Sequence, residues 1–143
     1  MAKMDRETFE KELQRKYLQL QLYKHQLNTL VEQKNTIESR VEELKMTIHA
    51  LEGLENVKKG EEIWSSLGSS AFVMSGIKDT DNVLINIGAG VVIKNTRKRS
   101  MEILQSRLNE LEEVNTALMA EIIKYSEEVG KLEPEVQRLA QQL

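Results

Sequence analysis

Apolar residues recur in two long heptad series, one at each end of the chain. The first series, in alternating steps of four and three, is Phe9, Leu13, Lys16, Leu20, Tyr23, Leu27, Leu30, Lys34, Ile37, Val41, Leu44, Ile48 and Leu51. The second is Met101, Leu104, Leu108, Leu111, Asn115, Leu118, Ile122, Tyr125, Val129, Leu132, Val136, Leu139 and Leu143. This spacing places apolar side chains on one face of a helix that packs against another helix. Two matched seams around a different kind of segment predict an antiparallel two-helix coiled coil.

The ends of the two helices also carry signals. Asp5 is a favourable N-cap for the first helix, which we expect to run to about residue 52, where Gly53 offers a C-terminal stop. The second helix is expected to begin near Thr96 or Ser100 and to continue to the C-terminus. The resulting segments are a coiled-coil helix in residues 1–53, a middle segment in 54–96 and a second coiled-coil helix in 97–143.

Three polar residues interrupt the apolar seams. Pairing Leu51 with Met101 keeps the two series in phase and places Lys16 opposite Val136. Lys34 and Asn115 are the other polar seam positions. Polar residues in such a seam usually fix the register at some cost in stability, and a long lysine side chain extends its charge to solvent. We therefore interpret these residues as register determinants.

Residues 55–96 lose the helical period and contain short β-branched runs. Turn residues separate these runs at Gly68–Ser70, Lys78–Asp81 and Gly88–Gly90. Runs of this kind predict two β-hairpins. Apolar residues occur on both faces of the strands, and isolated hairpins with open edges are only marginally stable in water. The hairpins are therefore expected to join those of other subunits in a shared sheet or barrel. The fold class is α+β.

Composition narrows the possible functions. The 143 residues carry a net charge of −3 and 30% charged residues, which argues against non-specific nucleic-acid binding. The sequence contains no cysteine, and its apolar runs are too short for a membrane span. The N-terminal residues lack the apolar core of a signal peptide. The expected compartment is the cytoplasm, with neither a membrane nor a nucleic acid as partner.

No motif predicts catalysis, a cofactor or a metal. The turn Gly88–Gly90 follows an apolar strand, but no helix follows, and the sequence has no P-loop for ATP. Asp79 begins a stretch that resembles a calcium loop, but its twelfth position is Gly90 where the bidentate glutamate is needed. The two histidines, His25 and His49, are too far apart on one helix to share a metal. We expect neither an enzyme nor a cofactor.

The free ends of the helices carry the sharpest functional hypothesis. Tyr17, Leu18 and Leu22 lie near the N-terminal end but outside the seam. Pro134 lies at the matching height in the second helix, where it removes a hydrogen bond and crowds the carbonyl of Gly130. We expect the last turns to splay. Splaying would partly expose Phe9, Leu13, Val136, Leu139 and Leu143 as a contact site, and ordinary fraying of helix ends is the alternative reading.

The order of helix, two hairpins and helix resembles the plan of prefoldin α-type subunits. The stretch KDTDNVLINIGAGVVIKNT, residues 78–96, looks like the second hairpin of that family. The resemblance implies an ATP-independent holdase in which two α and four β subunits form a hetero-hexamer through a double β-barrel. It further implies that the tips hold unfolded client proteins and deliver them to a group II chaperonin.

The resemblance also assigns residues to these roles. The client-binding tip would comprise Phe9, Leu13, Tyr17, Leu18, Val136, Leu139 and Leu143. The oligomer interface would comprise Phe72, Val73, Val83, Ile85, Val91 and Ile93. Pro134 is not an expected feature of the family. Two alternatives stay open: a filament or other structural protein assembled through its hairpins, and a coiled-coil adaptor for one folded partner.

Overall fold

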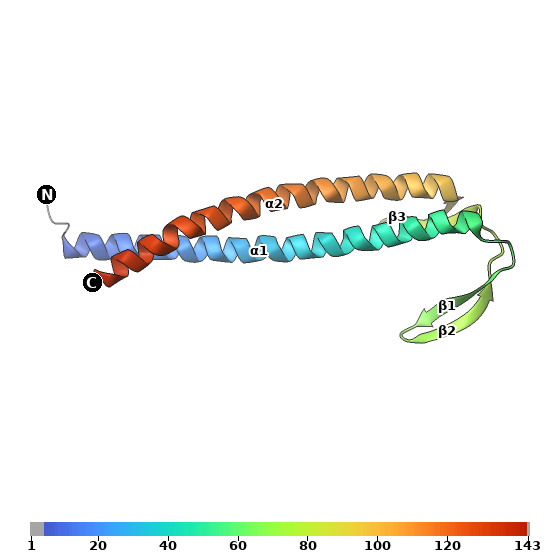
Figure 1. The fold of residues 1–143 in the computed structure, drawn as a ribbon, viewed down its shortest axis with the longest axis horizontal. Helices are drawn as coiled ribbons and strands as arrows, with labels where there is room; N and C mark the ends of the chain where they lie inside the picture. Colours follow the sequence, from blue (N-terminus) through green and yellow to red (C-terminus); the bar gives the residue numbers. More distant parts are fainter. Residues whose placement is uncertain (1–4, 143) are drawn as a thin grey trace. The chain divides into compact units, whose positions relative to one another are not determined.

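Two long helices and two β-hairpins form the fold in the computed structural model, which describes residues 5–142 (Figure 1). The elements in chain order are α1 (Arg6–Gly53), a 3-10 turn (Leu54–Asn56), β1 (Glu62–Gly68), β2 (Ala71–Gly76), β3 (Asn82–Gly88), β4 (Val91–Thr96) and α2 (Arg97–Gln141). The predicted fold of two helices with two hairpins between them is confirmed.

Contacts within the chain divide it into two units. The helical unit comprises the residues up to Ser39 together with those from Glu112, and the hairpin unit comprises Arg40–Leu111. Each unit therefore contains a piece of both helices, and the hairpin unit also holds all four strands. The division into segments 1–53, 54–96 and 97–143 remains a prediction about the chain's organisation.

The seam of the helical unit is an apolar core between α1 and α2. Leu20, Leu132 and Val136 are buried there, and Leu13, Tyr23 and Val129 pack against them. The rings of Tyr23 and Tyr125 meet edge to face with centroids 5.5 Å apart, a favourable geometry for aromatic pairs. Every predicted seam position among the described residues is buried or half-buried. The heptad pattern therefore identified the packed faces of both helices.

The helix ends differ in part from the expectation. The amide of Phe9 donates to the Asp5 carbonyl at 2.9 Å, so α1 begins directly after Asp5. Gly53 keeps a helical φ of −62°, and the left-handed conformation expected of a glycine stop is absent there. The chain leaves the helix instead through the 3-10 turn. At the other end, the Thr96 hydroxyl accepts a hydrogen bond from the Arg99 amide at 3.1 Å. Thr96 is therefore the N-cap of α2.

The strands pair only within their own hairpins in the described residues. β1 is antiparallel to β2 and places Trp64 opposite Met74, whereas β3 is antiparallel to β4 and places Ile85 opposite Ile93. The turn of the second hairpin needs positive φ at both central positions, 51° at Ala89 and 75° at Gly90. That geometry suits the right-handed twist of hairpin strands. Both predicted turns are confirmed.

Candidate functional site

The tip of the helical unit is closed, so the expectation of splayed last turns is wrong. Val136 and Leu139 are each only 9% exposed, and α2 continues through Pro134 to Gln141. The proline lies on the exposed side of α2, so its ring does not interrupt the seam. Phe9 and Leu13 are half-buried, and Leu143 lies outside the described residues. Because Val136 and Leu139 are buried, they stabilise the tip and are not accessible to a partner in this structure.

Two ion pairs join the helices beside this core. Lys16 Nζ lies 2.9 Å from Glu135 Oε2, and Lys24 Nζ lies 3.3 Å from Glu133 Oε1. The hydrogen bond and positive charge of Lys16 lower the pKa of the Glu135 carboxyl. The lysine side chain is 22% exposed, so its stem lies in the seam while its charge meets a carboxylate at the edge. This pairing agrees with the predicted register, in which Lys16 faces Val136.

An exposed apolar surface does occur in α1, on a face outside the seam. Leu18 is 63% exposed and Leu22 is 67% exposed. They are four residues apart and therefore neighbours on one helix face. Tyr17, half exposed, lies next to Leu18 in the sequence. We call Tyr17, Leu18 and Leu22 the outer apolar face. Leu22 is absent from the predicted tip set, although its non-seam position in an apolar segment pointed to it.

The β1–β2 hairpin is exposed on both faces. Trp64, Phe72 and Met74 lie on one face, because Trp64 pairs with Met74 and alternate residues share a face. Val73 lies on the other face and is also exposed. Trp64 is 66% exposed, which is unusual for so large an apolar side chain in a folded monomer. It was not among the predicted interface residues, although the alternation of the EIWSSLG run indicates it.

The β3–β4 hairpin is covered on one face only. Ile85 is 6% exposed, and Val83 and Ile93 are half-buried. Leu84, on the opposite face, is 73% exposed, and Val91 at the turn is about half exposed. Ile85 therefore packs within its own chain, and its role as an oligomer-interface residue stays a prediction. The sequence showed that both faces are apolar, but not which of them the helices cover.

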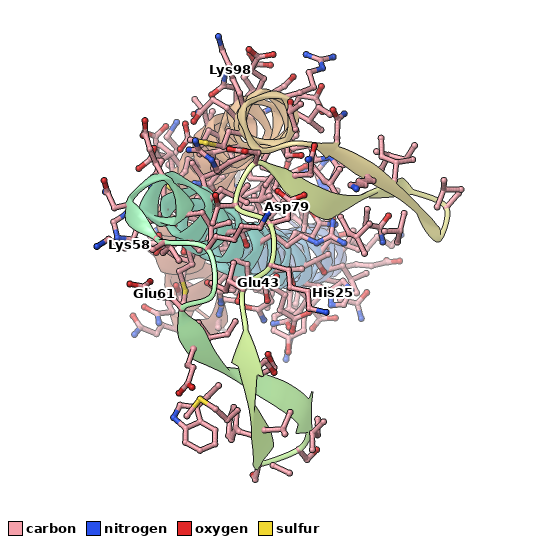
Figure 2. The ribbon with its side chains drawn as sticks, turned by 90° about the vertical axis from the view of Figure 1, so that its right-hand side faces the viewer. His25, Glu43, Lys58, Glu61, Asp79 and Lys98 are labelled. Atoms are coloured by element: carbon pink, nitrogen blue, oxygen red, sulfur yellow. The ribbon has the colours of Figure 1, made fainter. Side chains whose placement is uncertain are left out.

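Between the two hairpins, Asp79 organises a polar turn (Figure 2). Its carboxylate accepts hydrogen bonds from the amides of Asp81 and Asn82 at 2.8 and 3.1 Å and from the Asn82 side chain at 3.1 Å. These bonds, that of the Asn82 side chain foremost, lower the pKa of Asp79. Its oxygens are thus engaged in local structure. The described residues contain no group of three or more His, Cys, Asp and Glu placed to hold a metal.

Within residues 5–142, no helix is both long and apolar enough to cross a bilayer. Comparison with known proteins shows that the chain matches the prefoldin subunit family over residues 23–142. The chain belongs to the prefoldin family. The resemblance to prefoldin subunits seen in the sequence is therefore confirmed.

Relatives within the prefoldin family are archaeal α subunits. Prefoldin subunit alpha of Methanococcus vannielii is 27% identical, over 90% of this chain and 86% of the relative. Prefoldin subunit alpha of Methanococcus aeolicus is 31% identical, over 92% of both chains. These matches extend across both helices and both hairpins.

Solved prefoldin structures share the fold. A chain of filamentous PFD from Methanocaldococcus jannaschii superposes with a TM-score of 0.71 and 16% identity, over 81% of this chain and 96% of that one. The prefoldin beta subunit from Thermococcus strain KS-1 superposes with a TM-score of 0.58 and 20% identity, over 96% of both chains. At these low sequence identities, the comparison shows only that the two structures share the fold of this chain.

Proposed function

We propose that this chain is a subunit of an ATP-independent holdase chaperone that binds unfolded proteins and delivers them to a group II chaperonin. Prefoldin subunits are chaperone subunits, and membership in that family is the observation that carries the proposal. The sequence has no P-loop, which agrees with an activity that does not use ATP. The family is one of chaperone subunits and not of known enzymes.

Assembly with other prefoldin subunits would use the hairpins. Exposed apolar residues on both faces of β1–β2, together with Leu84 on β3, form the kind of surface that a folded monomer rarely presents. Both hairpins also have open strand edges that another chain can pair with. We propose a hetero-hexamer of two α-type and four β-type subunits joined through these hairpins. The proposed interface residues remain Phe72, Val73, Val83, Ile85, Val91 and Ile93. Of these, Phe72, Val73 and Val91 are exposed in the single chain.

Client binding would use the tip of the helical unit. The outer apolar face of Tyr17, Leu18 and Leu22 is accessible as the chain stands. We propose it as the first contact for apolar segments of an unfolded chain. Phe9, Leu13, Val136 and Leu139 belong to the proposed site only if the last turns open, because the closed seam covers the two α2 residues. Leu143 is proposed from the sequence alone.

A filament-forming protein is the second candidate. The specific observation in its favour is the TM-score of 0.71 with a chain of the filamentous assembly. The exposed hairpin surfaces serve this alternative equally well, because they would pair copies of the same chain end to end. The two candidates differ in which chain occupies the hairpins.

Native mass spectrometry of the chain alone and mixed with a β-type prefoldin subunit tests this proposal. A discrete six-subunit species that forms only in the mixture, and that suppresses aggregation of a denatured client without ATP, is expected. Open-ended polymers of the chain alone would favour the filament. A dimer that is indifferent to the β-type subunit would contradict both. Trp64→Ser should weaken the assembly, whereas Met46→Ser, a change at an exposed site on α1, should not.

A further inference from the structure

A small pocket lies in the hairpin unit where the β3–β4 hairpin meets the two helices. Its volume is about 210 Å³, and apolar side chains of Leu51, Val83, Ile85 and Leu104 line it. Pockets for drug-sized ligands usually measure about 300–1,000 Å³. This pocket therefore suits a single side chain better than a larger molecule.

One fully buried hydroxyl group in the pocket has no partner. Ser100 is 0% exposed, and its Oγ makes no hydrogen bond within the described residues. Hydroxyls of Thr29, Thr36, Thr47 and Thr116 donate to the carbonyl four residues back in their own helices. Ser100 makes no such bond, and a buried polar group without a partner destabilises the fold. Ser100 also lines the pocket, so an acceptor bound there would supply the missing hydrogen bond.

One other side chain of the pocket is a charged hydrogen-bond donor. Asn86 also lines the pocket, but it alternates with Ile85 and so lies on the outer face of β3, where its side-chain oxygen accepts from the Gly88 amide at 2.8 Å. Arg107 follows Ser100 by two helical turns on the same face of α2, and helical side chains lean toward the N-terminus, here toward Ser100. Arg97 and Arg99 form ion pairs at the start of α2, and Arg107 forms none within the described residues. Two donors, the Ser100 hydroxyl and the Arg107 guanidinium, therefore line the pocket.

We propose that this pocket receives a glutamate or aspartate side chain of a neighbouring prefoldin subunit. The apolar lining would hold the CH₂ stem of the acid. Arg107 and Ser100 would donate to its carboxylate, and hydrogen bonds between charged groups are the strongest class in proteins. The pocket is continuous with the proposed assembly surface, because Leu84 also lines it and is 73% exposed. This inference rests on the proposed assembly through the hairpins.

Three single substitutions test the inference in the intact chain. Arg107→Gln removes the guanidinium, Ser100→Ala removes only the hydroxyl, and Lys98→Gln is the matched control for charge. Lys98 lies in the first turn of α2, two residues before Ser100. It is exposed, points outward and does not line the pocket (Figure 2). Circular dichroism and thermal unfolding of each isolated chain check that it folds as wild type does.

The measured quantity is the affinity of the chain for a β-type subunit, by titration with native mass spectrometry. Arg107→Gln is expected to weaken it about tenfold or more, and Ser100→Ala in the same direction by less, with Lys98→Gln near wild type. Variants that all assemble like wild type would overturn the inference. Failure of the wild type to assemble would contradict the proposed function itself, so the two failures are distinguishable.

Sodium acetate separates a neighbouring side chain from a free small carboxylate. If acetate raises the unfolding temperature of the isolated wild-type chain above that in sodium chloride at equal ionic strength, and Arg107→Gln abolishes this gain but assembles like wild type, the pocket is a site for free carboxylates. That result would overturn the subunit as occupant. Equal unfolding temperatures in the two salts, together with weaker assembly of Arg107→Gln, are the expected outcome.

Discussion

Lys16 Nζ lies 2.9 Å from Glu135 Oε2, so a lysine in the seam of α1 is paired with a carboxylate at the edge of α2. A lysine at a seam position destabilises the fold unless its charge is paired or hydrated. Here the partner is on the opposite helix. The pair therefore favours one register of α1 against α2 over its alternatives.

Protonation of Glu135 should weaken the tip at low pH. Lys16 lowers the pKa of this carboxyl in the folded chain. A carboxyl with a lowered folded pKa contributes stability above its unfolded pKa of about 4.3, and the contribution is lost as the pH falls through the folded value. Glu135→Gln should therefore unfold at a lower temperature than wild type at pH 7, and the difference should shrink as the pH falls below about 4.3.

Glu127→Gln provides the control for this comparison. Glu127 is exposed on the same helix and has no ion pair within the described residues, so its substitution should leave the unfolding temperature nearly unchanged at both pH values. A difference between Glu135→Gln and wild type that stays constant from pH 7 to pH 3 would contradict the role assigned to the pair.

Truncation of two nearby leucines in α1 should change the free energy of unfolding by very different amounts. Leu20 is 4% exposed in the core with Leu132 and Val136, whereas Leu18 is 63% exposed. Leu20→Ala should lower the free energy of unfolding by about 2–5 kcal/mol, since it removes buried apolar atoms and leaves a cavity. Leu18→Ala should change it by less than about 0.5 kcal/mol. Chemical denaturation of both variants measures this, and equal losses would contradict the assigned faces.

Replacing Pro134 should stabilise α2. The proline cannot donate a hydrogen bond to the Gly130 carbonyl, and proline is about 3 kcal/mol less favourable than alanine inside a helix. Because the site is near the end of α2, we expect Pro134→Ala to raise the free energy of unfolding by about 1–3 kcal/mol. Thermal unfolding by circular dichroism measures the gain.

Gly130→Ala is the companion to this variant. A Cβ at Gly130 meets no atom within 4 Å, so the substitution should add about 0.5–1 kcal/mol through backbone entropy alone. A neutral or destabilising effect of Pro134→Ala, together with stabilisation by Gly130→Ala, would contradict this prediction. It would show that the proline favours the backbone conformation that α2 adopts here.

Removing the outer apolar face should impair client holding without unfolding the tip. Leu18→Ser combined with Leu22→Ser deletes two exposed apolar side chains that the seam does not use. We expect a several-fold higher concentration of assembled chaperone to be needed to suppress aggregation of a denatured client, with an unchanged oligomer mass. Met46→Ser, which changes a 72% exposed methionine in the hairpin unit, is the matched control. Full suppression by the double variant would exclude this face as the client contact.

The sequence by itself determined the elements of this protein. The heptad series identified the face of each helix that packs, because a 3.5-residue repeat places the apolar residues on one face. The turn residues placed both hairpins, because Ala89-Gly90 and Ser69-Ser70 interrupt runs that alternate with period two. The stretch at 78–96 and the order of elements were sufficient to indicate the prefoldin family. All of these signals are local, so they survive without knowledge of the tertiary structure.

Only the tertiary structure decided which apolar side chains remain accessible. Periodicity assigned Val136 and Leu139 to the seam but could not show that the seam stays closed beyond Pro134. Nor could it show that Ile85 is covered while Leu84, its neighbour on the opposite face, is open. The burial of Ser100 likewise results from the meeting of a hairpin and two helices that are far apart in the sequence. A side chain is buried by contacts with segments that are distant in the sequence. A repeat within one segment does not encode those contacts.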